Sequence, residues 1–215
     1  MNLVLQEFIF VLQFLVVLVF YYFRRTLIAN QHILLLYIAL FTFIEDFGGH
    51  VLTRYQLINN KAYYSILSTV ILFLYFYFYY QQIKNAAYKR IILYAAIFLG
   101  IFSVFNIIFI QRIFEQFTSY NFCIGSVIMC VIICMYVIET MKSDLIIDLK
   151  KNLLFWVSIG LFFYYLMNIP VMAGFNHLVE SDSITLRIVY KVITYVVLYI
   201  QYILFIIGAI WMKKT

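Results

Sequence analysis

The chain has 215 residues, of which 67% are hydrophobic and only 11% are charged, and its formal net charge is +6. Soluble domains carry about 25% charged residues, so this composition excludes a soluble globular protein and a disordered chain. With one Pro, 7 Gly and a mean hydropathy of +1.01, the sequence predicts one integral membrane domain over residues 1–215.

Seven apolar stretches follow one another along the chain, each long enough to span a membrane as a helix. A spanning helix needs about 20 mostly apolar residues. The stretches are apolar at odd and even positions alike, which argues against transmembrane strands. The sequence therefore predicts an all-α bundle of seven transmembrane helices. The predicted spans are about 3–23, 33–53, 62–81, 91–110, 120–139, 152–173 and 186–211.

The basic residues between the spans indicate the orientation, because Lys and Arg accumulate in cytoplasmic loops. One side carries ten of them: Arg24, Arg25, Lys84, Lys89, Arg90, Lys142, Lys150, Lys151, Lys213 and Lys214. The other side carries four: Arg54, Lys61, Arg112 and Arg187. We therefore expect the N-terminus outside and the C-terminus in the cytoplasm, in a bacterial cytoplasmic membrane. The net charge then reflects topology, and no nucleic-acid partner is expected.

Several polar residues fall inside the predicted spans, where ionisable groups are costly and often mark function. At about 1.5 Å rise per residue, Asp46 lies in the outer third of the second span, with Glu45 beside it. His50 is four residues further on and shares a helical face with Asp46. The other polar residues expected at this level are Tyr64, Asn106, Asn168 and Lys191.

Helix-weakening residues occur at the same level. Gly48 and Gly49 predict an unwound turn in the second span, and Pro170 predicts a kink in the sixth. The inner half is mostly Leu, Ile, Val and Phe, so we expect a cavity that opens outward and is closed inward by packed side chains. The four tyrosines Tyr75, Tyr77, Tyr79 and Tyr80 are typical of an aromatic belt at the inner interface.

Three interpretations of the polar cluster stay open. The carboxylates and Lys191 can neutralise one another and hold helices together, or they can form a pocket for a ligand or ion. In either case Asp46 or Glu45 is expected within hydrogen-bond or water-bridged reach of Lys191 or Arg187. In the third interpretation a metal such as zinc is bound. Its ligands would be His50, His177, Asp46 and Glu180. The spacing typical of zinc sites is missing, so we expect no resident metal and no cofactor.

Residues 151–165, with the sequence KNLLFWVSIGLFFYY, carry a resemblance. This stretch resembles the entry to the sixth helix of small bacterial seven-helix membrane proteins and of the seven-helix sensory regions of histidine kinases. The resemblance implies a sensor that passes a signal to a cytoplasmic kinase.

These observations favour a receptor-like or sensory membrane protein that is not an enzyme and signals through a protein partner. The loops 82–90 and 140–151 are the expected docking surfaces for that partner. The ligand, a small molecule or ion from outside, would contact Glu45, Asp46, His50, Tyr64, Asn106, Asn168 and Lys191. The alternatives are a transporter or an accessory subunit of a membrane complex. A lipid-acting membrane enzyme is less favoured, because no nucleophile–base pair is evident.

Overall fold

The computed structural model of the chain describes residues 2–55, 60–142, 149–174 and 184–212. Within these residues all regular structure is helical, so the predicted all-α membrane bundle is confirmed at the level of fold class. The long helices are α1 (Asn2–Tyr22), α3 (Ile33–Arg54), α4 (Asn60–Gln82), α5 (Ala86–Phe105), α6 (Ser119–Met141), α7 (Leu153–Ala173) and α9 (Ile184–Trp211). Two short elements were not predicted: helix α2 (Arg24–Ala29) and the π-helical turn η1 (Asn106–Ile110), which extends α5.

Six of these helices are long and apolar enough to cross a membrane. The spans are Ile33–Leu52, Asn60–Gln82, Ala86–Ile110, Ser119–Met141, Leu153–Ala173 and Ile188–Trp211. They agree with six of the seven predicted spans to within a few residues. The apolar part of α1, Glu7–Tyr22, is shorter than the others. The chain is therefore an integral membrane protein with at least these six candidate spans.

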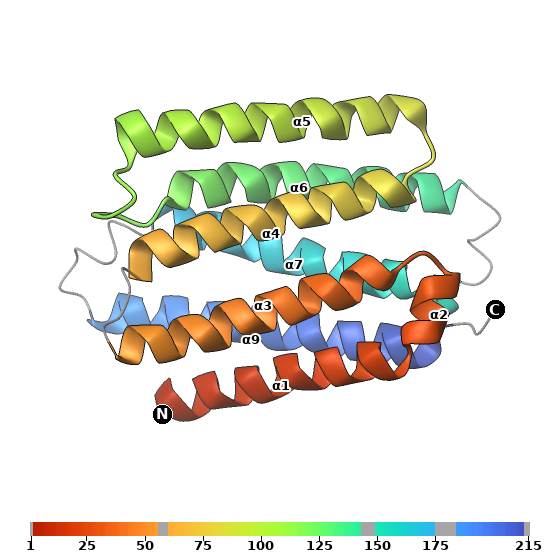
Figure 1. The fold of residues 1–215 in the computed structure, drawn as a ribbon, viewed down its shortest axis with the longest axis horizontal. Coiled ribbons are helices and arrows are strands. Elements are labelled where there is room, and N and C mark those ends of the chain that lie inside the picture. Colours follow the sequence, from red (N-terminus) through yellow and green to blue (C-terminus); the bar gives the residue numbers. More distant parts are fainter. Residues whose placement is uncertain (1, 56–59, 143–148, 175–183, 213–215) are drawn as a thin grey trace.

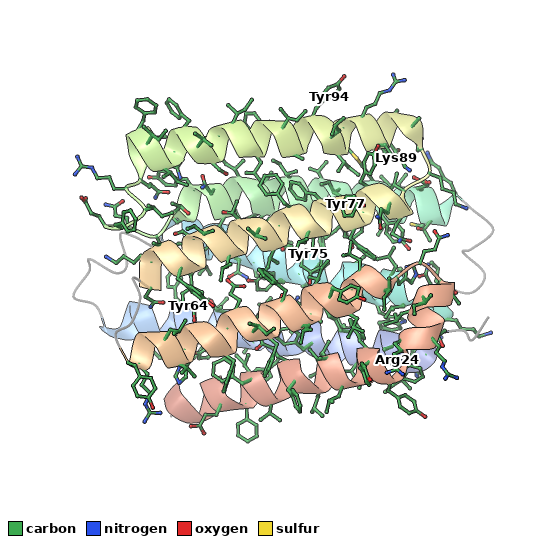
Figure 2. All side chains as sticks on the ribbon, viewed as in Figure 1. Arg24, Tyr64, Tyr75, Tyr77, Lys89 and Tyr94 are labelled. Carbon is green, nitrogen blue, oxygen red and sulfur yellow. The ribbon has the colours of Figure 1, made fainter. Side chains whose placement is uncertain are left out.

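Six helices form a closed ring. Successive neighbours in contact are α1, α3, α4, α6, α7 and α9, and α9 returns to α1. Helix α5 lies outside this ring and packs only against α4 and α6 within the described part of the chain (Figure 1). Most of its apolar side chains are exposed, as Tyr94 is in Figure 2. The ring can therefore enclose a site to which α5 does not contribute.

The ring is most tightly packed at the end where α2 lies. Side chains from α1, α2, α3, α4, α7 and α9 are fully or almost fully buried there. Phe20 of α1 stacks on Phe205 of α9 with ring centroids 6.2 Å apart. Arg24 and Lys89 mark this same end in Figure 2. The bundle is therefore closed by large apolar side chains at the end that carries most of the cations.

The tyrosines near this end of α4 correct one expectation. Tyr77 and Tyr80 are exposed, as a belt requires, but Tyr75 and Tyr79 are buried inside the ring. The Tyr79 hydroxyl is 2.7 Å from the Ser158 hydroxyl of α7. Residues four apart share one helical face, so Tyr75 and Tyr79 face the ring interior together.

The glycine pair Gly48–Gly49 corrects a second expectation, that of an unwound turn in this span. Helix α3 continues through Gly48 and Gly49 without an unwound turn. A Cβ atom on Gly49 would lie 2.5 Å from the Tyr64 hydroxyl oxygen and 2.7 Å from the Tyr63 ring. The missing side chain therefore lets two tyrosines of α4 lie directly on α3, a close approach that glycine permits.

Candidate functional site

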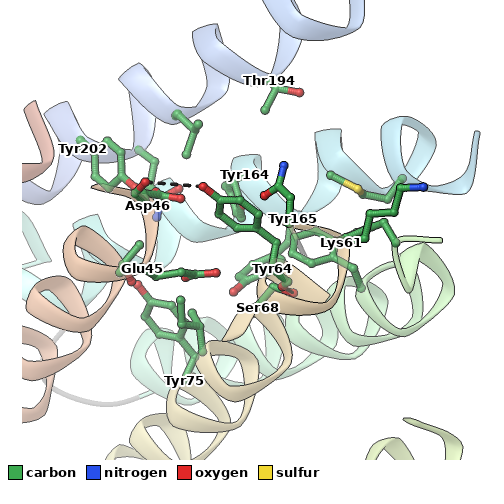
Figure 3. A pocket seen from close by; sticks show the side chains of 18 of the residues that line it. Glu45, Asp46, Lys61, Tyr64, Ser68, Tyr75, Tyr164, Tyr165, Thr194 and Tyr202 are labelled. Carbon is green, nitrogen blue, oxygen red and sulfur yellow. Dashed lines mark hydrogen bonds between the residues drawn. The ribbon is translucent and has the colours of Figure 1, made fainter. Parts of the chain in front are cut away.

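A cavity of about 550 Å³ lies inside the ring. Helices α3, α4, α6, α7 and α9 supply most of its wall, and the segment 115–117 contributes to its rim. The rim residues Asn60, Lys61 and Glu115 are exposed, whereas Tyr75 and Tyr202 are buried deep in the bundle (Figure 3). The cavity therefore opens at the end of the bundle opposite α2. The lining residues that are polar or aromatic are Thr42, Glu45, Asp46, Asn60, Lys61, Tyr64, Ser68, Tyr75, Glu115, Gln116, Phe117, Phe122, Tyr164, Tyr165, Thr194, Gln201 and Tyr202.

Two adjacent carboxylates from α3 line this cavity and differ in their partners. Asp46 accepts a hydrogen bond from the Gln13 side-chain amide of α1, and the same nitrogen lies 2.8 Å from the Tyr202 hydroxyl of α9. Glu45 is only 6% exposed. Within the described part of the chain, no side chain forms a hydrogen bond or ion pair with its carboxylate. Of these two carboxylates, Asp46 is therefore fixed by the protein, whereas Glu45 has no such partner among the described residues.

Tyrosines of α4 hold this part of α3 in place. The Tyr63 hydroxyl donates to the backbone carbonyl of Glu45 at 3.1 Å. The Tyr64 hydroxyl donates to that of Asp46 at 3.5 Å, as Figure 3 shows. Both contacts depend on the close approach over Gly49. The backbone that carries the two carboxylates is therefore positioned from α4, while Tyr64 also lines the cavity.

A second, much smaller cavity of about 20 Å³ lies deeper in the bundle and shares Thr42, Tyr75, Gln201 and Tyr202 with the first. The side-chain oxygens of Gln13 and Gln201 are buried there without a hydrogen-bond partner among the described residues. A space of this size accommodates about one water molecule when polar partners surround it. We therefore expect a buried water between these two amides.

Three of the seven predicted site residues line the large cavity: Glu45, Asp46 and Tyr64. His50 is directed toward α1, where its ring lies 5.4 Å from that of Phe10. Lys191 is exposed, and among the described residues it forms no ion pair with either carboxylate. The Arg187 side chain lies outside the described residues. Among the described residues a direct ion pair with Lys191 is thus absent, and Gln13 lies beside Asp46 instead. A contact with Arg187 or a water-bridged contact stays a prediction.

The two predicted asparagines are buried away from the cavity. Asn106 starts η1, where its amide nitrogen donates to Gln111 at 3.0 Å and to Asn121 of α6 at 2.9 Å. It therefore joins α5 to α6 outside the ring. The Asn168 amide donates to the Tyr164 carbonyl one turn earlier in α7 at 2.8 Å. Neither side chain is among those that line the cavity.

Only two of the four proposed metal ligands, His50 and Asp46, lie among the described residues. His177 and Glu180 lie outside the described residues. In the part of the chain that is described, no group of three or more His, Cys, Asp or Glu side chains lies close enough to hold a metal ion. His50 and Asp46, both on α3, are directed to different neighbours, Phe10 and Gln13.

Sequence reasoning missed several residues of the site. Gln13 was visible as an amide within a predicted span, but its position beside Asp46 depends on α1 being next to α3. The aromatic residues of the wall, Tyr75, Tyr164 and Tyr165, were hidden among 20 Tyr and 23 Phe. The four-residue spacing of Tyr75 and Tyr79 was the available signal, because it predicts one buried face.

The comparisons with known proteins give no relative from which a role can be transferred. No protein-family model matches the chain, and no curated protein or solved structure matches it either.

Proposed function

We propose that the chain is a receptor-like, sensory membrane protein that binds a small ligand in the cavity between α3, α4, α7 and α9. The observation that carries this proposal is the one-sided cavity, about 550 Å³ in volume, within the ring of helices. Volumes of this size are typical of small-molecule sites. The end of the bundle beyond the cavity is packed with buried apolar side chains, so a ligand has access from one side.

The orientation belongs to the same proposal. The end at which the cavity opens is the side with four basic residues, and the opposite end is the side with ten. The positive-inside rule then makes the cavity face outward in a bacterial cytoplasmic membrane. In this arrangement α1 is the seventh span, with the N-terminus outside. A phosphatase fused to the C-terminus is expected to be inactive, because it would remain in the cytoplasm.

The route of the signal follows from the helices that share the cavity. Helices α7 and α9 both line it, and they form the most extensive helix pair in the described structure. A ligand that alters their packing would move their cytoplasmic ends, because packed helices shift as rigid elements. The segments 82–90 and 140–151, which include the adjoining ends of α4, α5 and α6, are the proposed docking surfaces for a partner such as a sensor kinase. This role also agrees with the resemblance of residues 151–165.

A transporter is the second candidate, and one observation favours it. The polar chain of Gln13, Asp46 and Tyr202 extends below the large cavity toward Gln201. A transporter needs a polar route that becomes open to each side in turn. In the receptor proposal these polar side chains instead form a fixed floor of the cavity.

A single engineered cysteine distinguishes the two functions. In a variant without the three native cysteines, Ser68→Cys places a thiol in the cavity wall, and Ser126→Cys places one at a fully buried position of α6. The receptor proposal expects a membrane-impermeant maleimide to label Ser68→Cys from the outer side only and not to label Ser126→Cys. Labelling of Ser68→Cys from both sides would favour the transporter. Absence of labelling from outside would contradict the outward cavity.

A further inference from the structure

Glu45 is a buried acid for which the described residues supply no neutralising partner. Its side chain is 6% exposed and lines the cavity (Figure 3). In the described part of the chain the one ion pair is Arg112–Glu115, on the surface, with a distance of 3.1 Å. Keeping a carboxylate charged away from water is costly unless a cation or several donors accompany it. A cation that enters the cavity would remove this cost.

The neighbouring carboxylate explains why the two acids are not equivalent. Asp46 accepts from Gln13, which also lies within hydrogen-bond distance of Tyr202. Asp46 therefore has a fixed place in the cavity floor, whereas the Glu45 carboxylate is left for a ligand. A negative charge on either group raises the attraction of the cavity for a cation.

The wall around these acids also suits a cation. Tyr64, Tyr75, Tyr164, Tyr165 and Phe122 line the cavity from three different helices. The faces of aromatic rings carry partial negative charge and attract cations, most of all ammonium groups with apolar substituents. A bare metal ion instead prefers several oxygen ligands at short distance. The volume of the cavity, about 550 Å³, further indicates that the ligand is a molecule rather than a monatomic ion.

The cation on the cavity rim does not supply the missing charge. Lys61 is exposed, and its ammonium group donates to the backbone carbonyl of Glu115. Figure 3 shows the Lys61 side chain extending away from Glu45 and Asp46. The deep part of the cavity thus keeps its acidic character in the presence of Lys61.

We infer that the ligand of this cavity is a small organic cation, whose ammonium group pairs with Glu45 and whose apolar part packs against the tyrosines. This inference rests on the proposed function, because it names the ligand class of the same outward cavity. Asp46 acts as a positioned second negative charge. Neutral and anionic molecules of the same size are expected to bind more weakly.

The test compares two organic cations with a neutral molecule that has the shape of one of them. Purified protein in nanodiscs is titrated with phenethylammonium, with phenyltrimethylammonium, and with tert-butylbenzene, the neutral isostere of the second probe. Binding is measured by calorimetry and by the rise in melting temperature at constant ionic strength. We expect both cations to bind and the isostere to bind about 10- to 100-fold more weakly, which is typical of losing one charged contact.

Variants assign the effect to Glu45. Glu45→Gln keeps the shape and removes the charge, so affinity for both cations should fall about 10-fold or more, while binding of the isostere stays unchanged. Glu45→Asp should retain the preference for cations, which separates charge from misfolding. Glu7→Gln makes the same substitution at an exposed position of α1 and should leave binding unchanged.

The outcomes separate this inference from the proposed function. If the cations bind no better than tert-butylbenzene, or Glu45→Gln leaves their preference intact, the organic-cation inference is wrong. The same holds if Na⁺ alone stabilises the protein as much as either probe. External labelling of Ser68→Cys would still support an outward ligand cavity in those cases. Failure of that labelling would contradict the proposed function itself.

Discussion

The contact between Gly49 of α3 and the tyrosines of α4 gives the sharpest prediction on stability. In Gly49→Ala the new methyl group would lie 2.5 Å from the Tyr64 hydroxyl oxygen and 2.7 Å from both tyrosine rings. At least one ring must move, and the hydrogen bond from Tyr63 to the Glu45 carbonyl, 3.1 Å long, is then lost or weakened. The variant therefore disturbs the backbone that carries the two carboxylates.

The magnitude follows from three opposing contributions. Overpacking costs about 1–3 kcal/mol, and one lost hydrogen bond costs about 1 kcal/mol. Replacing Gly by Ala inside a helix returns about 1 kcal/mol. We therefore expect Gly49→Ala to lose about 1–3 kcal/mol, which corresponds to a melting temperature lower by about 3–9 °C for a chain of this size.

The adjacent glycine provides the matched control. A Cβ atom on Gly48 would lie 3.6 Å from the Tyr63 hydroxyl, which is an ordinary van der Waals contact. Gly48→Ala should therefore keep or slightly raise the melting temperature in detergent, measured with a thiol-reactive dye that reports exposure of the native cysteines. Equal melting temperatures for the two variants would refute the close-approach argument, as would a more stable Gly49→Ala.

Three further changes test other parts of the fold. Gln13→Leu removes the donor that Asp46 shares with Tyr202 and should cost about 2 kcal/mol; an unchanged melting temperature would show that water replaces the amide. Glu139→Ala removes the acceptor of the Lys84 amide before α5 and should cost about 1 kcal/mol, whereas Glu139→Asp should lose less. Burial lowers the pKa of His32 from 6.5 to about 4, so the folded chain prefers neutral His32. This contribution to stability, at most about 3 kcal/mol, is complete above pH 6.5 and is lost as the pH falls toward 4. In His32→Gln the decline in melting temperature between pH 7 and 4 should be smaller, and a decline as steep as that of the unchanged chain would exclude His32 as its source.

The sequence predicted the fold class, but it did not predict the lateral positions of the polar residues. Span length and depth depend on hydropathy and on the fixed rise per residue, and both can be counted along the chain. The direction in which a side chain faces depends on which helices are neighbours. Asn106 illustrates the difference, because it lies in η1 at the end of α5, outside the ring, where no sequence pattern could reveal its place.

The site itself was predictable only in part, for the same reason. Glu45 and Asp46 stand out as adjacent acids within an apolar span, and both line the cavity as expected. Their expected partner Lys191 was chosen by charge, yet Asp46 is paired with a neutral amide from α1. A long apolar sequence offers many residues capable of hydrogen bonding, and proximity between α1, α3 and α9 decides which of them is used.

The position of α5 has a consequence for how the chain is threaded. Helices α4 and α6 are neighbours in the ring and run in the same direction (Figure 1). A continuous chain can place two parallel helices side by side only by travelling back along the full length of the bundle between them. Helix α5 is that return passage. Deleting it would invert α6, α7 and α9 relative to α4, although α5 adds little to the core. Its length and apolar character are therefore constrained, while the identity of outward residues such as Ile101 and Ile108, 68% and 62% exposed, is free to vary among apolar types.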